Sequence, residues 1–287
     1  MALLSPELLA TLARLGLKSA VRATGRSGGV HRSRRRGVSQ EFADHRPYVP
    51  GDDIRFLDWH VYGRLDALWV KRFEEHEDRV VQLLIDTSAS MEGEKLAYAQ
   101  QLSGALAFVA LGAEDRVAVG AIAERLVAYH APRRGRAAAS SVFTSIESVH
   151  PAGTTDLGKG IDAWPRQHGS GLALLFSDLL YPEGPDLALR RLLSRGNEVH
   201  VFHLIAPSDL RPALSGDMVL VDSETGEELA ATVDEGVLDA YEATVRAWAD
   251  EMAQTCARNG CGYTRVLTST PVREVLLGDL RRSGLIT

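Results

Sequence analysis

Short apolar runs alternate with amphipathic segments along most of the chain from residue 80 onward. The apolar runs have the length and composition of buried strands, and the segments between them repeat Leu, Ala and Val at helical spacing. The predicted strands span 80–85, 116–122, 172–176, 198–204 and 262–267. The predicted helices span 94–112, 139–149, 157–164, 186–196, 235–258 and 271–283. This alternation predicts an α/β fold in which helices cover both faces of a mostly parallel sheet.

The start of the chain has a different pattern. Leu8, Leu9, Leu12 and Leu15 fall on one side of a short amphipathic helix. No basic residue precedes the apolar part of this segment, as it would in a secretory signal. We therefore expect a helical arm rather than a targeting sequence.

Two further segments depart from the strand–helix alternation. Residues 41–79 are rich in Asp, Arg and aromatic side chains, and 67–73 could form a strand. Residues 218–229 predict a hairpin with its turn at 224–226. We divide the chain into an N-terminal arm and small β-containing extension, residues 1–79, and an α/β domain, residues 80–287.

The composition is that of a soluble globular protein. Of the 287 residues, 45% are apolar and 24% are charged, and no apolar run approaches the roughly 18 residues of a membrane span. The two cysteines, Cys256 and Cys261, are separated by four residues, which fits neither a redox pair nor a zinc site. We expect a reducing, cytoplasmic location and no membrane span.

Charge is unevenly distributed along the chain. The first 36 residues contain eight basic residues and one acid, which gives +7, whereas the remainder contains 24 basic and 37 acidic residues, which gives −13. A basic arm over residues 14–36 could bind nucleic acid or an anionic surface. It could equally lie against the acidic body of its own chain. Without interleaved aromatic residues or a known nucleic-acid module, we favour docking against the chain itself or plain solvation of the arm, and we regard nucleic-acid binding as the alternative.

Polar side chains follow two of the predicted strands directly. Asp86, Ser88 and Ser90 follow the strand at 80–85, and Asp178 follows the strand at 172–176. Ligands of open parallel sheets bind beyond the carboxyl ends of the strands, so these side chains should meet at one edge. Thr154 and Thr155 enter a helix between the two strands and should open on the same edge.

An all-oxygen set of this kind suits Mg²⁺, Mn²⁺ or Ca²⁺ and disfavours zinc and copper. Two carboxylates would balance the charge of the ion, and hydroxyls and water would supply neutral oxygens. The alternative is that Ser88 or Ser90 merely caps the following helix while Asp86 complements its dipole. Agreement among three loops favours the metal.

The same residues argue against an enzyme. A phosphatase that uses Asp86 with Mg²⁺ would need a second acid two residues later as its general acid, and that position is Ser88. No GxxxxGK[ST] loop and no GxSxG elbow occurs. We expect a protein without enzymatic activity, and an unrecognised metal-dependent hydrolase is a further alternative.

The constellation resembles the metal-ion-dependent adhesion site of a von Willebrand factor A domain, which has a Rossmann-like fold. Asp86-Thr-Ser88-Ala-Ser90 is similar to the DxSxS motif of that family, Thr155 stands at its motif threonine and Asp178 at its motif aspartate. Thr155 has better spacing to the predicted helix than Thr154. The resemblance implies an ion with one open coordination position, which an acidic side chain of a partner protein fills.

The preceding segment resembles the family called domain of unknown function 58, in which it leads directly into an A-like domain. The resemblance extends from about residue 20 over nearly the whole chain. It is carried by residues 29–37, Glu41, Phe42, Arg46, Tyr48, Pro50, Gly51, Asp52, Asp53, Arg55, Asp58 and Trp59, and by the tail at 238–241. Relatives of this family are commonly encoded beside MoxR-type AAA+ ATPases. The resemblance therefore implies an adaptor or co-chaperone that works with such an ATPase.

The charged residues of this segment allow two interpretations. Arg46, Asp52, Asp53, Arg55 and Asp58 could form a buried ion-pair network that docks the arm, with Tyr48 and Trp59 as packing residues. Alternatively, the seven residues form a surface for the ATPase or for a client protein. We favour the ion-pair network.

Overall fold

The structure of the protein is a computed structural model. It describes residues 3–18, 39–76, 79–154, 156–165, 171–181, 184–222 and 226–287, and at 39–44 and 72–76 it describes the backbone alone. The chain divides into two units. One unit comprises Met1–Gly25 and Arg79–Thr287, and the other comprises Arg26–Asp78. The amphipathic helix at the start of the chain thus belongs with the α/β domain.

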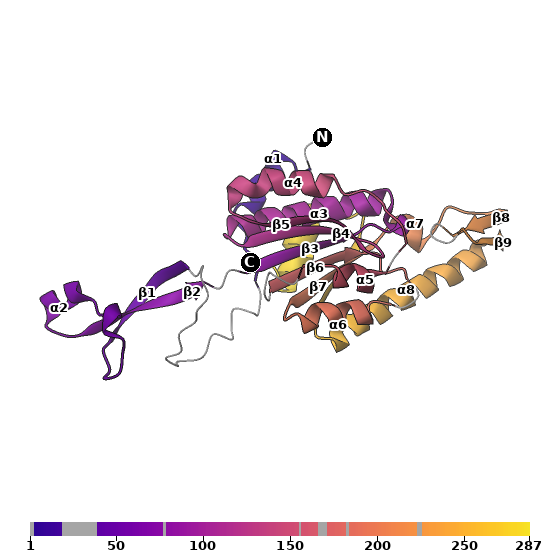
Figure 1. The fold of residues 1–287 in the computed structure, drawn as a ribbon. Helices are drawn as coiled ribbons and strands as arrows, with labels where there is room; N and C mark the ends of the chain where they lie inside the picture. Colours follow the sequence, from indigo (N-terminus) through magenta and orange to yellow (C-terminus); the bar gives the residue numbers. More distant parts are fainter. Residues whose placement is uncertain are drawn as a thin grey trace. The chain divides into compact units, whose positions relative to one another are not determined.

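A six-stranded sheet forms the centre of the first unit (Figure 1). Its order is β10-β7-β6-β3-β4-β5, and all neighbouring pairs are parallel except β4 and β5. The strands are β3 (Val80–Asp86), β4 (Arg116–Ile122), β5 (Leu126–Arg134), β6 (Gly171–Ser177), β7 (Glu198–Ile205) and β10 (Gly262–Leu267). The predicted mostly parallel sheet is confirmed.

Helices cover both faces of this sheet, as the alternation of apolar segments predicts. Val81, Leu83 and Ile85 of β3 point into one core, whereas Val80 and Leu84 point into the other. The first core lies under α1 (Pro6–Leu12), α3 (Glu94–Gly112), α4 (Ala139–Glu147) and the C-terminal turns α9 (Val272–Glu274), η6 (Val275–Asp279) and α10 (Leu280–Arg282). The second lies under α5 (Leu157–Asp162), α6 (Asp186–Ser194) and α8 (Glu235–Arg258). Short helical turns η3 (Ala89–Met91) and η4 (Arg136–Ala138) precede α3 and α4.

The antiparallel edge strand β5 is the main element that the sequence pattern does not predict. Its side chains are half-buried or exposed along its whole length, because it lies at the edge of the sheet. Pro132 within it is tolerated at an edge, where one side of the backbone has no partner strand. A strand of this kind lacks both the apolar run and the strict alternation that mark buried or half-buried strands.

Helix α1 packs on the first core through the predicted leucines. Leu12 is buried, and Leu8, Leu9 and Leu15 pack against the same core. The residues that follow pair with the C-terminus, where Lys18 N donates to the carbonyl of Leu285 at 2.9 Å. The remaining basic residues of the predicted arm, at 22–36, lie outside the described residues.

The second unit is a small antiparallel pair of strands with short helices. β1 (Ser39–Pro47) pairs with β2 (Trp69–His76), so that the strand predicted at 67–73 begins two residues later and ends three residues later than expected. The connection between them carries η2 (Ile54–Phe56) and α2 (Trp59–Leu65). Only Leu57, Asp58 and Val70 are buried among its side chains that the structure describes.

A second hairpin leaves the α/β domain after β7. The chain passes through α7 (Pro207–Leu210) into β8 (Gly216–Val221), which pairs with β9 (Glu228–Val233) before α8 begins. The hairpin predicted over 218–229 is therefore confirmed, and its predicted turn at 224–226 lies mostly outside the described residues. No helix in the described part of the chain combines the length and hydrophobicity needed to span a bilayer.

Candidate metal centre

The predicted ligand residues lie where the winding of the sheet reverses. Numbered along the chain, the six strands have the order 3-2-1-4-5-6 from the β5 edge, so that the reversal falls between β3 and β6. Open α/β sheets bind ligands at the carboxyl ends of the two strands that flank this switch point. Asp86 ends β3 and Asp178 follows β6, and the paired residues Ile85 and Phe176 hold the two strand ends side by side.

Asp86 is fully buried and receives a hydrogen bond on each carboxylate oxygen. The Ser88 amide donates to Oδ1 at 2.9 Å, and the Ser177 hydroxyl donates to Oδ2 at 2.5 Å. Burial raises the pKa of Asp86 to about 7, and the negative charge of Asp178 adds to the shift, while the hydrogen bonds from Ser177 and Ser88 oppose it. Two carboxylates are thus held close together away from water, an arrangement that a divalent cation would relieve.

Ser88 and Ser90 stand together beside Asp86. Their Oγ atoms are 3.0 Å apart, Ser88 is buried and Ser90 is half-buried. Neither residue uses its side chain to cap η3 or α3, because the N-cap residues of these helices, Ser88 and Gly93, make no side-chain capping bond. The alternative in which the hydroxyl of Ser88 or Ser90 caps the following helix is therefore wrong for η3 and α3.

The loop that carries the threonines is joined to the loop of the serines by backbone hydrogen bonds. The Ala89 amide donates to the carbonyl of Gly153 at 3.1 Å, and the Ala152 amide donates to that of Thr87 at 2.6 Å. Thr155 itself lies outside the described residues. The Thr154 hydroxyl lies 3.5 Å from a carboxylate oxygen of Glu124. The loops at the ends of β3 and β6 and the loop before α5 therefore converge on one edge of the sheet.

Asp178 is held by a lysine that the sequence pattern does not single out. Lys95, in the first turn of α3, donates to Asp178 Oδ2 at 2.6 Å and lies 3.1 Å from Asp209 Oδ2. The side chains of Lys95 and Asp178 are 6% and 2% exposed. Burial lowers the pKa of Lys95, but Asp178 and Asp209 outweigh burial and raise it, so that the ammonium stays charged. The only feature of the sequence that could have identified Lys95 is its position as a lysine on the apolar face of a predicted helix.

The backbone after Asp178 takes an unusual conformation. Leu179 is a buried non-glycine residue with a φ of 58°, in the left-handed region. This turn directs the Leu179 amide to Ser177 Oγ at 2.9 Å and the Leu180 amide to Asp178 Oδ1 at 3.2 Å. Such strain persists where the surrounding structure fixes it, and here it orients both the donor to Asp86 and the second carboxylate.

Four described residues thus offer oxygen atoms to a divalent cation: Asp86, Ser88, Ser90 and Asp178. Among the residues described by the structure, no group of three or more His, Cys, Asp and Glu is placed to bind a metal ion. A site here would depend on hydroxyl and water oxygens beside two carboxylates, which are the donors that Mg²⁺, Mn²⁺ and Ca²⁺ accept.

The candidate docking surface predicted between Arg46 and Trp59 lies in the small unit. Its arginines form ion pairs with aspartates that are close to them in the sequence. Arg46 binds Asp52 through both carboxylate oxygens at 2.6 and 2.7 Å, and Arg55 binds Asp53 at 2.5 Å. The Arg46 guanidinium lowers the pKa of Asp52, and Arg55 lowers that of Asp53 to about 2. The Arg55–Asp53 pair is exposed and the Arg46–Asp52 pair is half-buried, so the two pairs are separate and do not form one buried network.

The remaining residues of this surface divide into a buried anchor and exposed rings. Asp58 caps α2, and His45 and Lys71 lie 2.8 and 3.4 Å from its carboxylate. Trp59 is 63% exposed and packs edge-on against Tyr62, and Tyr48 is half-buried. Trp59 therefore packs on Tyr62 at the surface of this unit and not in a buried core.

The fold and the polar switch point define a doubly wound α/β protein with a candidate ligand site at its switch point. Residues 44–251 match the family model described as "Protein of unknown function DUF58", and the chain belongs to this family. Uncharacterized protein Rv1480 of Mycobacterium tuberculosis and uncharacterized protein Mb1516 of Mycobacterium bovis are each 30% identical to it over 270 residues, which cover 90% of this chain and 83% of theirs.

Solved structures similar to the chain are distant. The conserved hypothetical protein BatB from Bacteroides thetaiotaomicron is 17% identical with a TM-score of 0.43, and the match covers 72% of this chain and 98% of that one. An aerotolerance-related membrane protein from Bacteroides fragilis is also 17% identical, with a TM-score of 0.42 and coverage of 66% and 91%.

Proposed function

We propose that this chain is a non-enzymatic protein-binding module that holds a divalent cation at the switch point, in the manner of a von Willebrand factor A domain. Asp86, Ser88, Ser90, Thr155 and Asp178 would supply the protein oxygens, and an acidic side chain of a partner protein would complete the coordination. The observation that carries the proposal is the buried pair of carboxylates, Asp86 and Asp178, beside two hydroxyls with no capping role.

The electrostatics of the pair support a cation. Two buried carboxylates repel each other, and their mutual repulsion contributes to the raised pKa of Asp86. Lys95 carries one positive charge and lies between Asp178 and Asp209, so it compensates the three carboxylates of Asp86, Asp178 and Asp209 only in part. A divalent ion bound there would compensate the remaining negative charge, and an open coordination position on the ion would accept an anionic ligand such as a partner's Asp or Glu.

The wider role follows from the family resemblance. We propose an adaptor or co-chaperone that acts with a MoxR-type AAA+ ATPase in the cytoplasm, and that prefers Mg²⁺, with Mn²⁺ or Ca²⁺ as substitutes. The exposed Trp59 and the ion pairs of the small unit remain a candidate surface for the ATPase or a client. Nucleic-acid binding through residues 14–36 and hydrolase activity stay alternative hypotheses.

Replacing Asp86 with asparagine is expected to remove divalent-metal binding while leaving the fold intact. The asparagine keeps the size of the side chain and an acceptor for the Ser88 amide, but it removes the ligand charge. It also removes the buried like-charge repulsion, so the metal-free variant should be at least as stable as the wild type at pH 8. Isothermal titration with Mg²⁺ and Mn²⁺, together with chemical denaturation in chelator, measures both effects.

Asp250→Asn is the matched control, because it removes one carboxylate from a largely exposed site on α8. It should bind metal as the wild type does. Equal metal affinity in Asp86→Asn and wild type would exclude the proposed site. A metal-induced stabilisation of about 2.7 kcal/mol at a hundredfold excess over Kd is expected only where Asp86 is present.

A further inference from the structure

The hairpin of β8 and β9 carries exposed apolar side chains on both faces. Val219 and Val221 share one face and are 57% and 62% exposed. Leu220 and Leu229 are cross-strand partners on the other face and are 36% and 65% exposed. Within the two strands only Val233 is buried. The face of Leu220 and Leu229 is therefore apolar, whereas on the other face Val219 and Val221 stand among the polar residues Asp217, Glu228 and Thr232.

The neighbouring start of α8 is similarly uncovered. Val237 and Tyr241 are 46% and 43% exposed, and Leu238 is the buried residue between them. Figure 1 shows the hairpin and this half of α8 extending beyond the sheet and the other helices. An isolated two-stranded hairpin is marginally stable in water, and exposed apolar patches on a folded protein commonly mark a contact surface.

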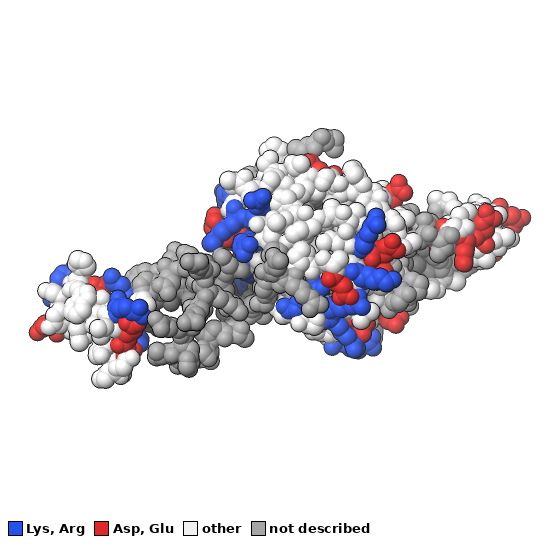
Figure 2. Space-filling model, in the orientation of Figure 1, with Lys and Arg blue, Asp and Glu red and all other residues white. Residues whose placement is uncertain are grey.

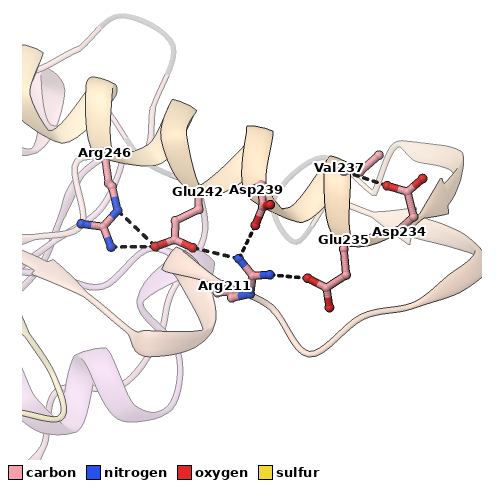
Figure 3. A network of polar contacts seen from close by, with 7 residues as sticks. All are labelled: Arg211, Asp234, Glu235, Val237, Asp239, Glu242 and Arg246. Atoms are coloured by element: carbon pink, nitrogen blue, oxygen red, sulfur yellow. Dashed lines mark hydrogen bonds and ion pairs between the residues drawn. The ribbon is translucent and has the colours of Figure 1, made fainter.

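An ion-pair cluster fixes the base of the hairpin to α8 (Figure 3). Arg211, which precedes β8, donates to Asp239 at 2.8 Å and to Glu242 at 3.0 Å, and it also pairs with Glu235. Arg246 binds Glu242 from the other side at 2.6 Å. The residue that follows β9, Asp234, caps α8 by accepting from the Val237 amide at 2.8 Å. Both ends of the hairpin are thus tied to the same helix, which limits the conformational freedom that binding would otherwise remove.

The charge of this region selects the partner. Residues 212–245 contain four Asp and five Glu but no Lys or Arg. The basic residues at the two ends of this range, Arg211 and Arg246, are engaged with its acids. Figure 2 shows acidic side chains gathered at β8, β9 and the start of α8. A second copy docking through the same surface would bring like charges together, whereas a basic segment would be attracted.

We propose that the hairpin surface, which comprises Leu220 and Leu229 on one face of the hairpin, Val219 and Val221 on the other face, and Val237 and Tyr241 at the start of α8, binds a basic protein segment that carries apolar side chains. The apolar residues supply the buried contact, and the surrounding carboxylates attract and orient the segment. Binding here requires no metal ion and is separate from the proposed coordination by a partner's acid.

The hairpin surface is connected to the candidate metal centre through α7. Strand β7 ends at Ile205, α7 follows, and Lys95 joins Asp209 of α7 to Asp178. Two residues after Asp209, Arg211 begins the cluster that holds the hairpin. A partner whose acidic residue lies near a basic apolar segment could therefore contact both sites, and each contact can be tested without the other.

The test uses a fluorescent peptide of alternating Leu and Lys that carries a photo-cross-linker at its centre. Fluorescence anisotropy is measured for the full chain and for a double variant, Val221→Ser with Leu229→Ser, which removes apolar area without disturbing buried residues. We expect affinity at least tenfold weaker in the double variant. Val127→Ser, a 39% exposed position on the edge strand β5, is the matched control and should bind as the wild type does.

Further measurements test which charge the bound segment must carry and where on the protein it binds. A Leu–Glu peptide should not bind, added salt should weaken binding of the Leu–Lys peptide, and its cross-links should fall within residues 214–241. Asp86→Asn should bind the peptide normally, so that failure of the metal proposal is distinguishable from failure of this one. Equal binding by the double variant, equal binding of the Leu–Glu peptide, or cross-links elsewhere would overturn the proposal. Concentration-dependent self-association that the double variant abolishes would instead identify a second copy as the occupant and would also overturn it.

Discussion

Replacing Lys95 with methionine is expected to lower the free energy of unfolding of the metal-free protein by about 3–5 kcal/mol. Methionine fills most of the volume of the lysine stem, so the main loss is the ammonium. Asp178, whose side chain is 2% exposed, would keep a buried charge without its closest partner. Asp86, the other buried carboxylate, stands beside it. Urea denaturation at pH 8 in chelator measures the change.

Added Mg²⁺ should stabilise Lys95→Met more than it stabilises the wild type. In the wild type the ammonium already compensates Asp178, to which it donates at 2.6 Å. Without the ammonium, the cation becomes the compensating charge. Lys159→Met is the control, because Lys159 is 74% exposed in its pair with Asp156 and the change should be under about 0.5 kcal/mol. A Lys95→Met protein as stable as this control would contradict the role of Lys95.

Metal affinity is expected to fall about tenfold for each pH unit below the pKa of Asp86, which lies at about 7. The metal ligand is the carboxylate, so below pH 7 the ion must displace a proton. Between pH 8 and pH 6 the apparent Kd for Mg²⁺ should rise about tenfold, and it should be flat above pH 8. Titration in buffers of different ionisation enthalpy should show nearly one proton released at pH 6 and almost none at pH 8.5.

The free energy of unfolding of the metal-free protein should fall as the pH rises, whereas the metal affinity should rise. The pKa of Asp86 is raised in the folded state above its usual value of about 4, so the folded state binds more protons between these two pH values. The contribution of Asp86 to stability is fully present below pH 4 and is lost as the pH rises through 7.

The charged groups near Asp86 do not change this expectation. Asp178 is bound by Lys95, which stays protonated, and burial lowers the pKa of His203 on β7 to about 3, so that this ring stays neutral. A Kd for Mg²⁺ that is constant from pH 6 to 8.5 would contradict the buried-carboxylate account.

The central sheet could be predicted because its strands are buried on both faces. Every residue of β3 and β6 is buried, which gives the continuous apolar runs that mark a parallel strand. The exposed edge strand β5 gives no such run, and its position was not predicted. The first helix was predicted from its leucines, but its packing against the same core as α3 depends on contacts between distant parts of the chain.

The residues of the candidate site that lie at strand ends could be predicted from the sequence. Asp86 ends one buried strand and Asp178 follows another, and the order of the strands then places them together. Ser177 and Lys95 were not predicted, because their roles depend on the left-handed turn at Leu179 and on the approach of α3 to the end of β6. A pattern of residue types along one chain carries neither piece of information.

The most direct measurement is an anomalous difference map from a crystal of this protein soaked in Mn²⁺. We expect one strong peak at the carboxyl ends of β3 and β6, about 2.0–2.4 Å from oxygens of Asp86, Ser88 or Ser90, with Asp178 bound directly or through water. The peak should be absent from Asp86→Asn crystals soaked in the same way. A peak elsewhere alone, no peak at all, or an unchanged peak in the variant would contradict the proposed metal centre.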